Sequence, residues 1–139
     1  MKKISLYINK VNEPVDGYEP IDIRTVEILQ DIPNNSCNKI IIQDTLDYVA
    51  DKSILQLAIS KLAYEGEFIL IGTDLRTVCY EFAHYKIDVN TIHHFLYENK
   101  INIGTVEDYT TLLIAHGLHI IKNILDDYRY TIVAVRNAN

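Results

Sequence analysis

Short apolar runs alternate along this chain with segments of helical periodicity. Residues 3–8 and 18–23 predict two strands near the start, and residues 25–29, apolar at alternate positions, could form another. Residues 39–43 contain three consecutive isoleucines. A short β-branched run bounded by turn residues is typical of a strand buried in a parallel sheet. The first third of the chain therefore predicts mostly strands.

The period of the pattern changes after residue 50. Apolar residues at helical spacing predict a helix that begins at Asp51 or Ser53, either of which can cap it, and ends at Gly66. Residues 68–72, Phe-Ile-Leu-Ile-Gly, predict the next buried strand. A strand, a helix and a further apolar strand form a βαβ unit, which places its two strands parallel.

Further helices are expected in the second half of the chain. Asp74, or Thr73 before it, can cap a helix whose apolar residues share one face. Residues 88–104 predict a short helix and then a loop from residue 99. A clear helix begins at Thr105, which forms a near capping box with Asp108 three residues later.

The chain closes with two predicted strands, at residues 118–125 and 130–135, after Gly117 ends the last helix. The Asp-Asp pair between them predicts a turn, and so short a connection lets the strands pair antiparallel. The whole pattern predicts an α/β fold: a Rossmann-like, mainly parallel sheet flanked by helices and closed by an antiparallel C-terminal hairpin. Residues 1–139 are expected to form a single domain, because their number suits one hydrophobic core.

The composition narrows the classes of protein that fit. A formal net charge of −6, with 13 scattered basic residues, argues against a nucleic-acid partner, which needs clustered Lys and Arg. No apolar run approaches the ~20 residues that cross a bilayer, and no signal peptide is recognised, so we expect no membrane partner and a cytoplasmic location. Cys37 and Cys79 fit no metal spacing and are expected to be buried or partly buried free thiols.

The residue bias suggests a source. The chain is rich in Ile, Asn, Lys and Tyr, which is typical of genes with AT-rich codons. An AT-rich bacterium or its phage would fit, and a viral protein could be associated with the virion. Ten tyrosines could support a contact surface for a protein partner or a homo-oligomer, or could reflect the codon bias alone.

Several segments resemble, in the same order, those of class I S-adenosylmethionine-dependent methyltransferases. The opening is similar to the start "I-x-(I/L)-G-C-G-x5-G-(Y/W)-x-N-(V/I)-D" of compact members often found near polysaccharide-biosynthesis enzymes, with Gly17-Tyr18 and Ile21-Asp22 retained. Further matching segments are residues 31–40, 46–48, 62–68, 73–75 and 114–118. The resemblance spans nearly the whole chain and implies a Rossmann-like fold with S-adenosylmethionine as the cofactor.

The cofactor turn departs from the family pattern. Tyr7, Ile8 and Asn9 stand where the family has Gly-Cys-Gly, a turn that lets the backbone approach the cofactor closely. The tyrosine ring and the β-branched side chain are expected to fill the space of the cofactor's methionine part and ribose. Asp22 matches the acid that binds the ribose hydroxyls in the family, or it simply ends a strand at the surface.

Four residues are candidates for cofactor binding: Asn9, Asp22, Gln43 and Asp44. The last two lie at the end of the buried strand, at the sheet edge where ligands bind in such folds, although Asp44 can equally cap a helix. No catalytic residue is expected, because residues 46–48 lack the histidine of the family's Leu-Glu-His. No metal site is expected, because the five histidines show no chelating spacing.

These observations lead to two hypotheses about function. The first is a methyltransferase-like protein that has lost S-adenosylmethionine binding and catalysis, needs no cofactor, and serves as a binding or structural component, for example in a viral assembly. The alternative is an active S-adenosylmethionine-dependent methyltransferase with an atypical cofactor pocket. In that enzyme Asp22 would bind the ribose and Asp44 or Gln43 would lie near the substrate, since methyl transfer needs mostly positioning.

Overall fold

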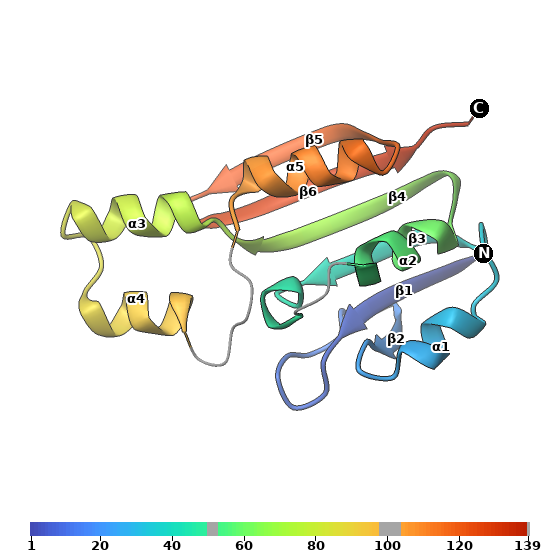
Figure 1. The fold of residues 1–139 in the computed structure, drawn as a ribbon, viewed down its shortest axis with the longest axis horizontal. Coiled ribbons are helices and arrows are strands. Elements are labelled where there is room, and N and C mark those ends of the chain that lie inside the picture. Colours follow the sequence, from blue (N-terminus) through green and yellow to red (C-terminus); the bar gives the residue numbers. More distant parts are fainter. Residues whose placement is uncertain (50–52, 98–103, 139) are drawn as a thin grey trace.

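The computed structural model describes residues 1–49, 53–97 and 104–138, and its centre is a six-stranded sheet (Figure 1). The strands are β1 (Lys2–Tyr7), β2 (Glu19–Asp22), β3 (Cys37–Gln43), β4 (Leu62–Thr73), β5 (Leu118–Asp126) and β6 (Arg129–Arg136). Their order is β2-β1-β3-β4-β6-β5. Strands β1 to β4 are parallel to one another, and β6 pairs antiparallel with both of its neighbours, β4 and β5. The predicted mainly parallel sheet with a closing hairpin is confirmed.

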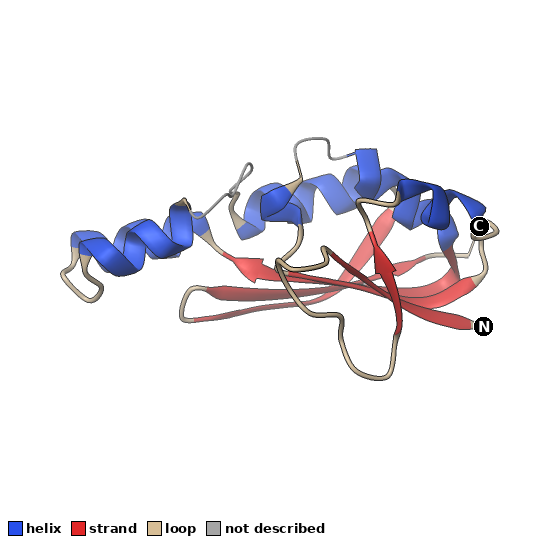
Figure 2. Cartoon of the chain, turned by 90° about the horizontal axis from the view of Figure 1, so that it is seen from below, coloured by secondary structure: helices blue, strands red, loops and turns tan. Residues whose placement is uncertain are grey.

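The helices lie unevenly around this sheet. They are α1 (Val26–Asp31), the 3₁₀ helix η1 (Leu46–Tyr48), α2 (Ser53–Lys61), α3 (Leu75–Ala83), α4 (Val89–Leu96) and α5 (Val106–Ala115). In Figure 2, α1, α2 and α5 lie on one side of the sheet. Helices α3 and α4 extend beyond the end of β4 (Figure 1).

The hydrophobic core lies between the sheet and these helices. Alternate residues of four strands point into it, and each is at most 1% exposed: Ile4, Leu6, Ile40, Ile42, Phe68, Leu70, Ile132 and Ala134. The helices contribute Leu29, Leu55, Ala58 and Leu113 from one face each. Alternation along the strands and helical spacing along the helices therefore meet in one layer of buried side chains.

Two sequence predictions are wrong. Residues 25–29 form the start of α1 instead of a strand, because Val26 and Leu29 are three residues apart and both pack on the core from a helix. The helix expected to end at Gly66 ends at Lys61, and β4 begins at the next residue. Gly66 lies inside β4, where a Cβ would come within 2.8 Å of the Ala63 carbonyl oxygen.

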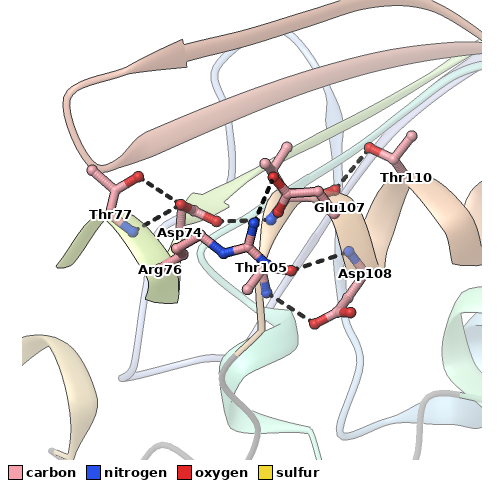
Figure 3. Close-up of polar contacts among 8 residues, drawn as sticks. Asp74, Arg76, Thr77, Thr105, Glu107, Asp108 and Thr110 are labelled. Atoms are coloured by element: carbon pink, nitrogen blue, oxygen red, sulfur yellow. Dashed lines mark hydrogen bonds and ion pairs between the residues drawn. The ribbon is translucent and has the colours of Figure 1, made fainter. Parts of the chain in front are cut away.

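The caps predicted at Asp74 and Thr105 are confirmed (Figure 3). Ser53, the other candidate cap, is the first residue of α2. The buried carboxylate of Asp74 accepts hydrogen bonds from the Thr77 N–H (3.0 Å) and hydroxyl (2.6 Å) in α3. It also accepts one from the Val106 N–H (2.8 Å), the first residue of α5. Thr105 and Asp108 form the expected capping box. The proposed Asp51 cap and most of the loop expected from residue 99 lie outside the described residues.

Candidate ligand site at the carboxyl edge of the sheet

The carboxyl ends of the parallel strands meet at one edge of the sheet. From β1 the chain passes to β2 on one side, and the next strand, β3, pairs with β1 on the other side. Such a reversal of strand order opens a crevice between the ends of the two central strands, where α/β folds bind ligands. In this protein the crevice lies between the ends of β1 and β3.

The side chain of Asn12 bridges this crevice. Its Nδ2 donates hydrogen bonds to the Gln43 carbonyl oxygen (2.9 Å) and to Thr45 Oγ1 (2.7 Å), both at the end of β3. Its Oδ1 accepts a hydrogen bond from the Ile8 N–H (2.7 Å), directly after β1. One amide therefore ties the ends of the two strands together at the switch point.

The connection from β1 to β2 contains no helix. Residues 8–18 form turns and a loop, and Lys10 has a φ of 67°. Parallel strands are usually joined through a helix, whose N-terminus supplies N–H groups and a partial positive charge to an anionic ligand. Ile8 is buried in the hydrophobic core. The residue that bridges the crevice is Asn12, which the sequence did not indicate.

Asp22 has its hydrogen-bonding partners within the chain. The Arg24 guanidinium contacts its carboxylate at 3.2 Å, and the Arg24 backbone N–H donates to Oδ1 at 3.0 Å. The Asn9 N–H is a weaker donor at 3.4 Å. The hydrogen bond from the Arg24 side chain is the main reason why the pKa of Asp22 lies below its ordinary value. Two of the predicted site residues, Asn9 and Asp22, are thus brought together.

Asp44 is not the helix cap that was considered. Its backbone φ is 55°, and its carboxylate receives two hydrogen bonds from Arg129, at 3.0 and 3.1 Å. Arg129 begins β6, which runs antiparallel and therefore starts where the parallel strands end. The sequence contained this signal, since the predicted hairpin places the residue after its turn at this edge.

A hollow of about 360 Å³ lies beside this ion pair. Its walls come from the loop after β1, the segment after β3, the end of β4, helix α4 and the start of β6: Val11, Asn12, Asp44, Asp47, Tyr48, Thr73, His94, Phe95 and Arg129. The Phe95 ring packs 4.5 Å, between centroids, from the Tyr128 ring of the hairpin turn. Of the four predicted site residues only Asp44 lines this hollow. His94 and Phe95 come from a helix that no motif linked to this edge.

The described residues offer little for metal or thiol chemistry. Among them, no three His, Cys, Asp or Glu side chains form a group that could hold a metal ion. Cys37 is buried, and burial raises the pKa of its thiol, which makes the nucleophilic thiolate scarce. Cys79 is exposed, contrary to the expectation of burial. No helix in the described part of the chain is long and apolar enough to cross a membrane.

Comparison with known proteins identifies the fold. No protein-family model matches the chain, and no curated protein sequence does so either. Solved structures do match: an S-adenosylmethionine-dependent methyltransferase from Archaeoglobus fulgidus is 14% identical, with a TM-score of 0.64 over 95% of this chain and 75% of that one. One from Thermotoga maritima is 12% identical, with a TM-score of 0.58 over 77% and 59%.

A third similar structure is a Haloferax volcanii complex of the Trm112 methyltransferase activator with a methyltransferase, at 13% identity and a TM-score of 0.57 over 91% of this chain and 65% of that one. The chain thus spans less than two thirds of the Thermotoga and Haloferax chains. At such identities the similarity concerns the fold alone. This protein has the α/β fold of S-adenosylmethionine-dependent methyltransferases, and the Haloferax complex is one example of a protein partner for that fold.

Proposed function

We propose that this protein is a binding component with a methyltransferase fold that no longer binds S-adenosylmethionine or transfers methyl groups. The observation that carries the proposal is Asn12, which ties the ends of β1 and β3 together in the crevice where a ligand would enter. The protein would serve as a protein-binding part of a larger assembly, which would be a viral assembly if the gene belongs to a phage.

The cost of opening this crevice supports the proposal. Moving Asn12 aside would break three hydrogen bonds and leave the Ile8 N–H without this acceptor, whereas the Gln43 carbonyl oxygen keeps the hydrogen bond from the Thr45 hydroxyl at 2.9 Å. Each part-buried group left unsatisfied costs roughly 1–3 kcal/mol. Asp22 would also have to exchange Arg24 for the ribose hydroxyls. A cofactor would have to offset these losses without help from a helix N-terminus.

A second candidate function, an active methyltransferase with an atypical cofactor pocket, rests on the hollow beside Asp44. It lies at the edge where ligands bind in this class of fold, and it is lined by carboxylates and aromatic rings. In this case Asp22 would release Arg24 to bind the ribose. Asp44 or Gln43 would lie near the substrate, and the chemistry would rest on positioning alone.

Calorimetric titration with S-adenosylmethionine and S-adenosylhomocysteine, together with thermal unfolding, separates the two functions. A hundredfold excess of a ligand over its Kd would stabilise the protein by about 2.7 kcal/mol. We expect no heat of binding and no stabilisation at millimolar ligand, with an authentic methyltransferase as the positive control. Stabilisation that Asp22→Ala removes and Glu19→Ala retains would support the enzyme instead. Glu19 is the matched control because it is an exposed carboxylate on the same strand.

A further inference from the structure

One face of the sheet carries no helix among the described residues (Figure 2). Strands in parallel sheets are ordinarily buried on both faces, because a helix layer covers each. In the middle of the three central strands β3, β4 and β6, this uncovered face carries five apolar side chains, with Thr131 beside one of them: Ile41, Ile69, Ile71, Val133 and Val135. We refer to this group as the open face.

The strand register makes the open face continuous. Ile41 pairs with Ile69, and Ile69 pairs with Val133, so these three side chains form a row across the sheet. Ile71 and Val135 extend the patch on opposite sides of this row. All but Ile41 are only half-buried in the middle of the sheet, where a covered strand would be fully buried.

The loop of residues 8–18 approaches this side of the sheet at β1. The Val15 N–H donates a hydrogen bond to the Ser5 hydroxyl at 2.9 Å, and Ser5 is buried. Ser5 pairs with Ile41 and therefore belongs to the same face. Hydrogen bonds of this loop reach β1, β2 and the end of β3, while Ile69, Ile71 and Val133 in β4 and β6 stay half-buried.

The size of the open face indicates one helix as its occupant. Three strands about 4.8 Å apart and rows about 6.7 Å apart give a patch of roughly 15 by 20 Å, or about 300 Å². A stable globular dimer needs about 800 Å² on each partner. A helix is about 10–12 Å wide, and three to four turns are about 16–22 Å long, so a single helix fits the patch.

The charges around the open face argue against a second copy of this chain. Lys3, Lys39 and Lys122 lie on the same side of the sheet as the apolar row, accompanied by Glu67, which pairs with Lys39 at 3.3 Å. The surroundings are thus net basic on a chain of net charge −6. Two copies stacked through this face would bring like charges together, whereas acidic side chains would complement the lysines.

We propose that the open face binds an amphipathic helix of a partner protein, with its apolar side on Ile69, Ile71 and Val133 and acidic residues over Lys39 and Lys122. Such helix-in-groove recognition places apolar anchors one turn apart and flanking charges at the rim. The inference goes beyond the proposed function, because it concerns a different surface from the cofactor edge and holds whether or not a cofactor binds.

Binding of labelled synthetic helices, followed by fluorescence anisotropy, tests the inference. The probe is an amphipathic peptide of about five turns with leucines on one face and glutamates flanking them. One control has lysines in place of the glutamates, and another has the same composition in scrambled order. We expect the acidic helix to bind saturably, the lysine helix to bind about tenfold more weakly, and the scrambled peptide not to bind.

Variants locate the binding. Val133→Glu and Lys122→Glu are each expected to weaken the binding of the acidic helix about tenfold. Lys122 lies on the exposed edge strand β5, so the Lys122→Glu variant is expected to fold even if the Val133→Glu variant does not. Tyr85→Glu, on the exposed turn between α3 and α4, is the control and should bind normally.

Three results of the binding experiments would overturn the inference. They are no binding of the acidic helix, equal binding of both charged helices, and loss of binding only in Tyr85→Glu. A dimer in sedimentation that Val133→Glu dissociates would also overturn it, since a second copy would then occupy the face. The titration with S-adenosylhomocysteine tests binding at the carboxyl edge of the sheet and not at the open face, so either proposal can fail without the other.

Discussion

Asn12 shows how one side chain can decide the character of a sheet edge. Its amide contacts the chain at three points, directly after β1, at the end of β3 and in the segment after β3. Two of these contacts satisfy backbone groups, the Ile8 N–H and the Gln43 carbonyl oxygen, at the ends of the two central strands. The stability of this edge should therefore depend on Asn12.

Asn12→Ala should lower the free energy of unfolding by about 1–3 kcal/mol, because it leaves the part-buried Ile8 N–H without its acceptor and removes two further hydrogen bonds. Equilibrium unfolding in urea measures the change. Asn9→Ala is the matched control: Asn9 is exposed, its backbone N–H is unaffected, and the expected change is below about 0.5 kcal/mol. Equal effects of the two substitutions would show that Asn12 does not hold the strands together.

At the scale of elements, Asp74 joins α3 to α5, whose first residue, Val106, lies 32 positions further along the chain. It caps α3 through Thr77 and also accepts the first N–H of α5 (Figure 3). Asp88 performs the same local task for α4 but remains exposed, and it accepts a hydrogen bond from the Thr91 N–H at 2.7 Å. Comparing the two aspartates therefore separates the contribution of local capping to stability from that of a tertiary connection between helices.

Asp74→Ala should cost about 2–4 kcal/mol of stability, because one cap is lost and a buried N–H of α5 loses its acceptor. Asp88→Ala should cost about 1 kcal/mol or less, as expected for an exposed cap. Chemical unfolding, followed by circular dichroism, compares the two variants. If Asp88→Ala costs as much as Asp74→Ala, the connection between α3 and α5 contributes nothing beyond ordinary capping.

At the scale of the whole molecule, two buried tyrosines make stability depend on alkaline pH. Tyr109 of α5 and Tyr130 of β6 pack with ring centroids 5.6 Å apart, and the Tyr130 ring lies against Gly72. Burial raises the pKa of both phenols above the ordinary value, because the charged form is disfavoured away from water. The folded protein therefore keeps both protons at a pH where the unfolded chain releases them.

The free energy of unfolding contributed by these phenols is fully present below about pH 10 and falls above it, by about 2.7 kcal/mol per pH unit for two groups. Tyr109→Phe should reduce this slope by about 1.4 kcal/mol per pH unit, since one group is removed. Tyr80→Phe is the control, because Tyr80 is exposed. Urea unfolding at several alkaline pH values measures the slopes, and an unchanged slope in Tyr109→Phe would contradict the prediction.

The errors in the sequence prediction lie in short segments that fit two patterns. Residues 25–29 satisfied an alternating pattern and a helical one at once, and packing of Val26 and Leu29 on the core decided for the helix. Gly66 looked like a helix end, yet the strand continues through it, where the crowded backbone leaves no room for a Cβ. A short pattern cannot choose between such alternatives, because the choice depends on distant partners.

The sequence by itself determined most of the elements, the parallel βαβ unit, the closing hairpin and the caps at Asp74 and Thr105. These follow from periodicity and from hydrogen bonds within a few residues. The predicted hairpin placed the start of β6 at the carboxyl edge, but only the tertiary structure decided that Arg129 pairs there with Asp44 and that Asn12 joins the ends of β1 and β3. It also decided that one face of the sheet carries no helix among the described residues. Such contacts join residues 31 and 85 positions apart, and only the packing of the whole chain sets their register.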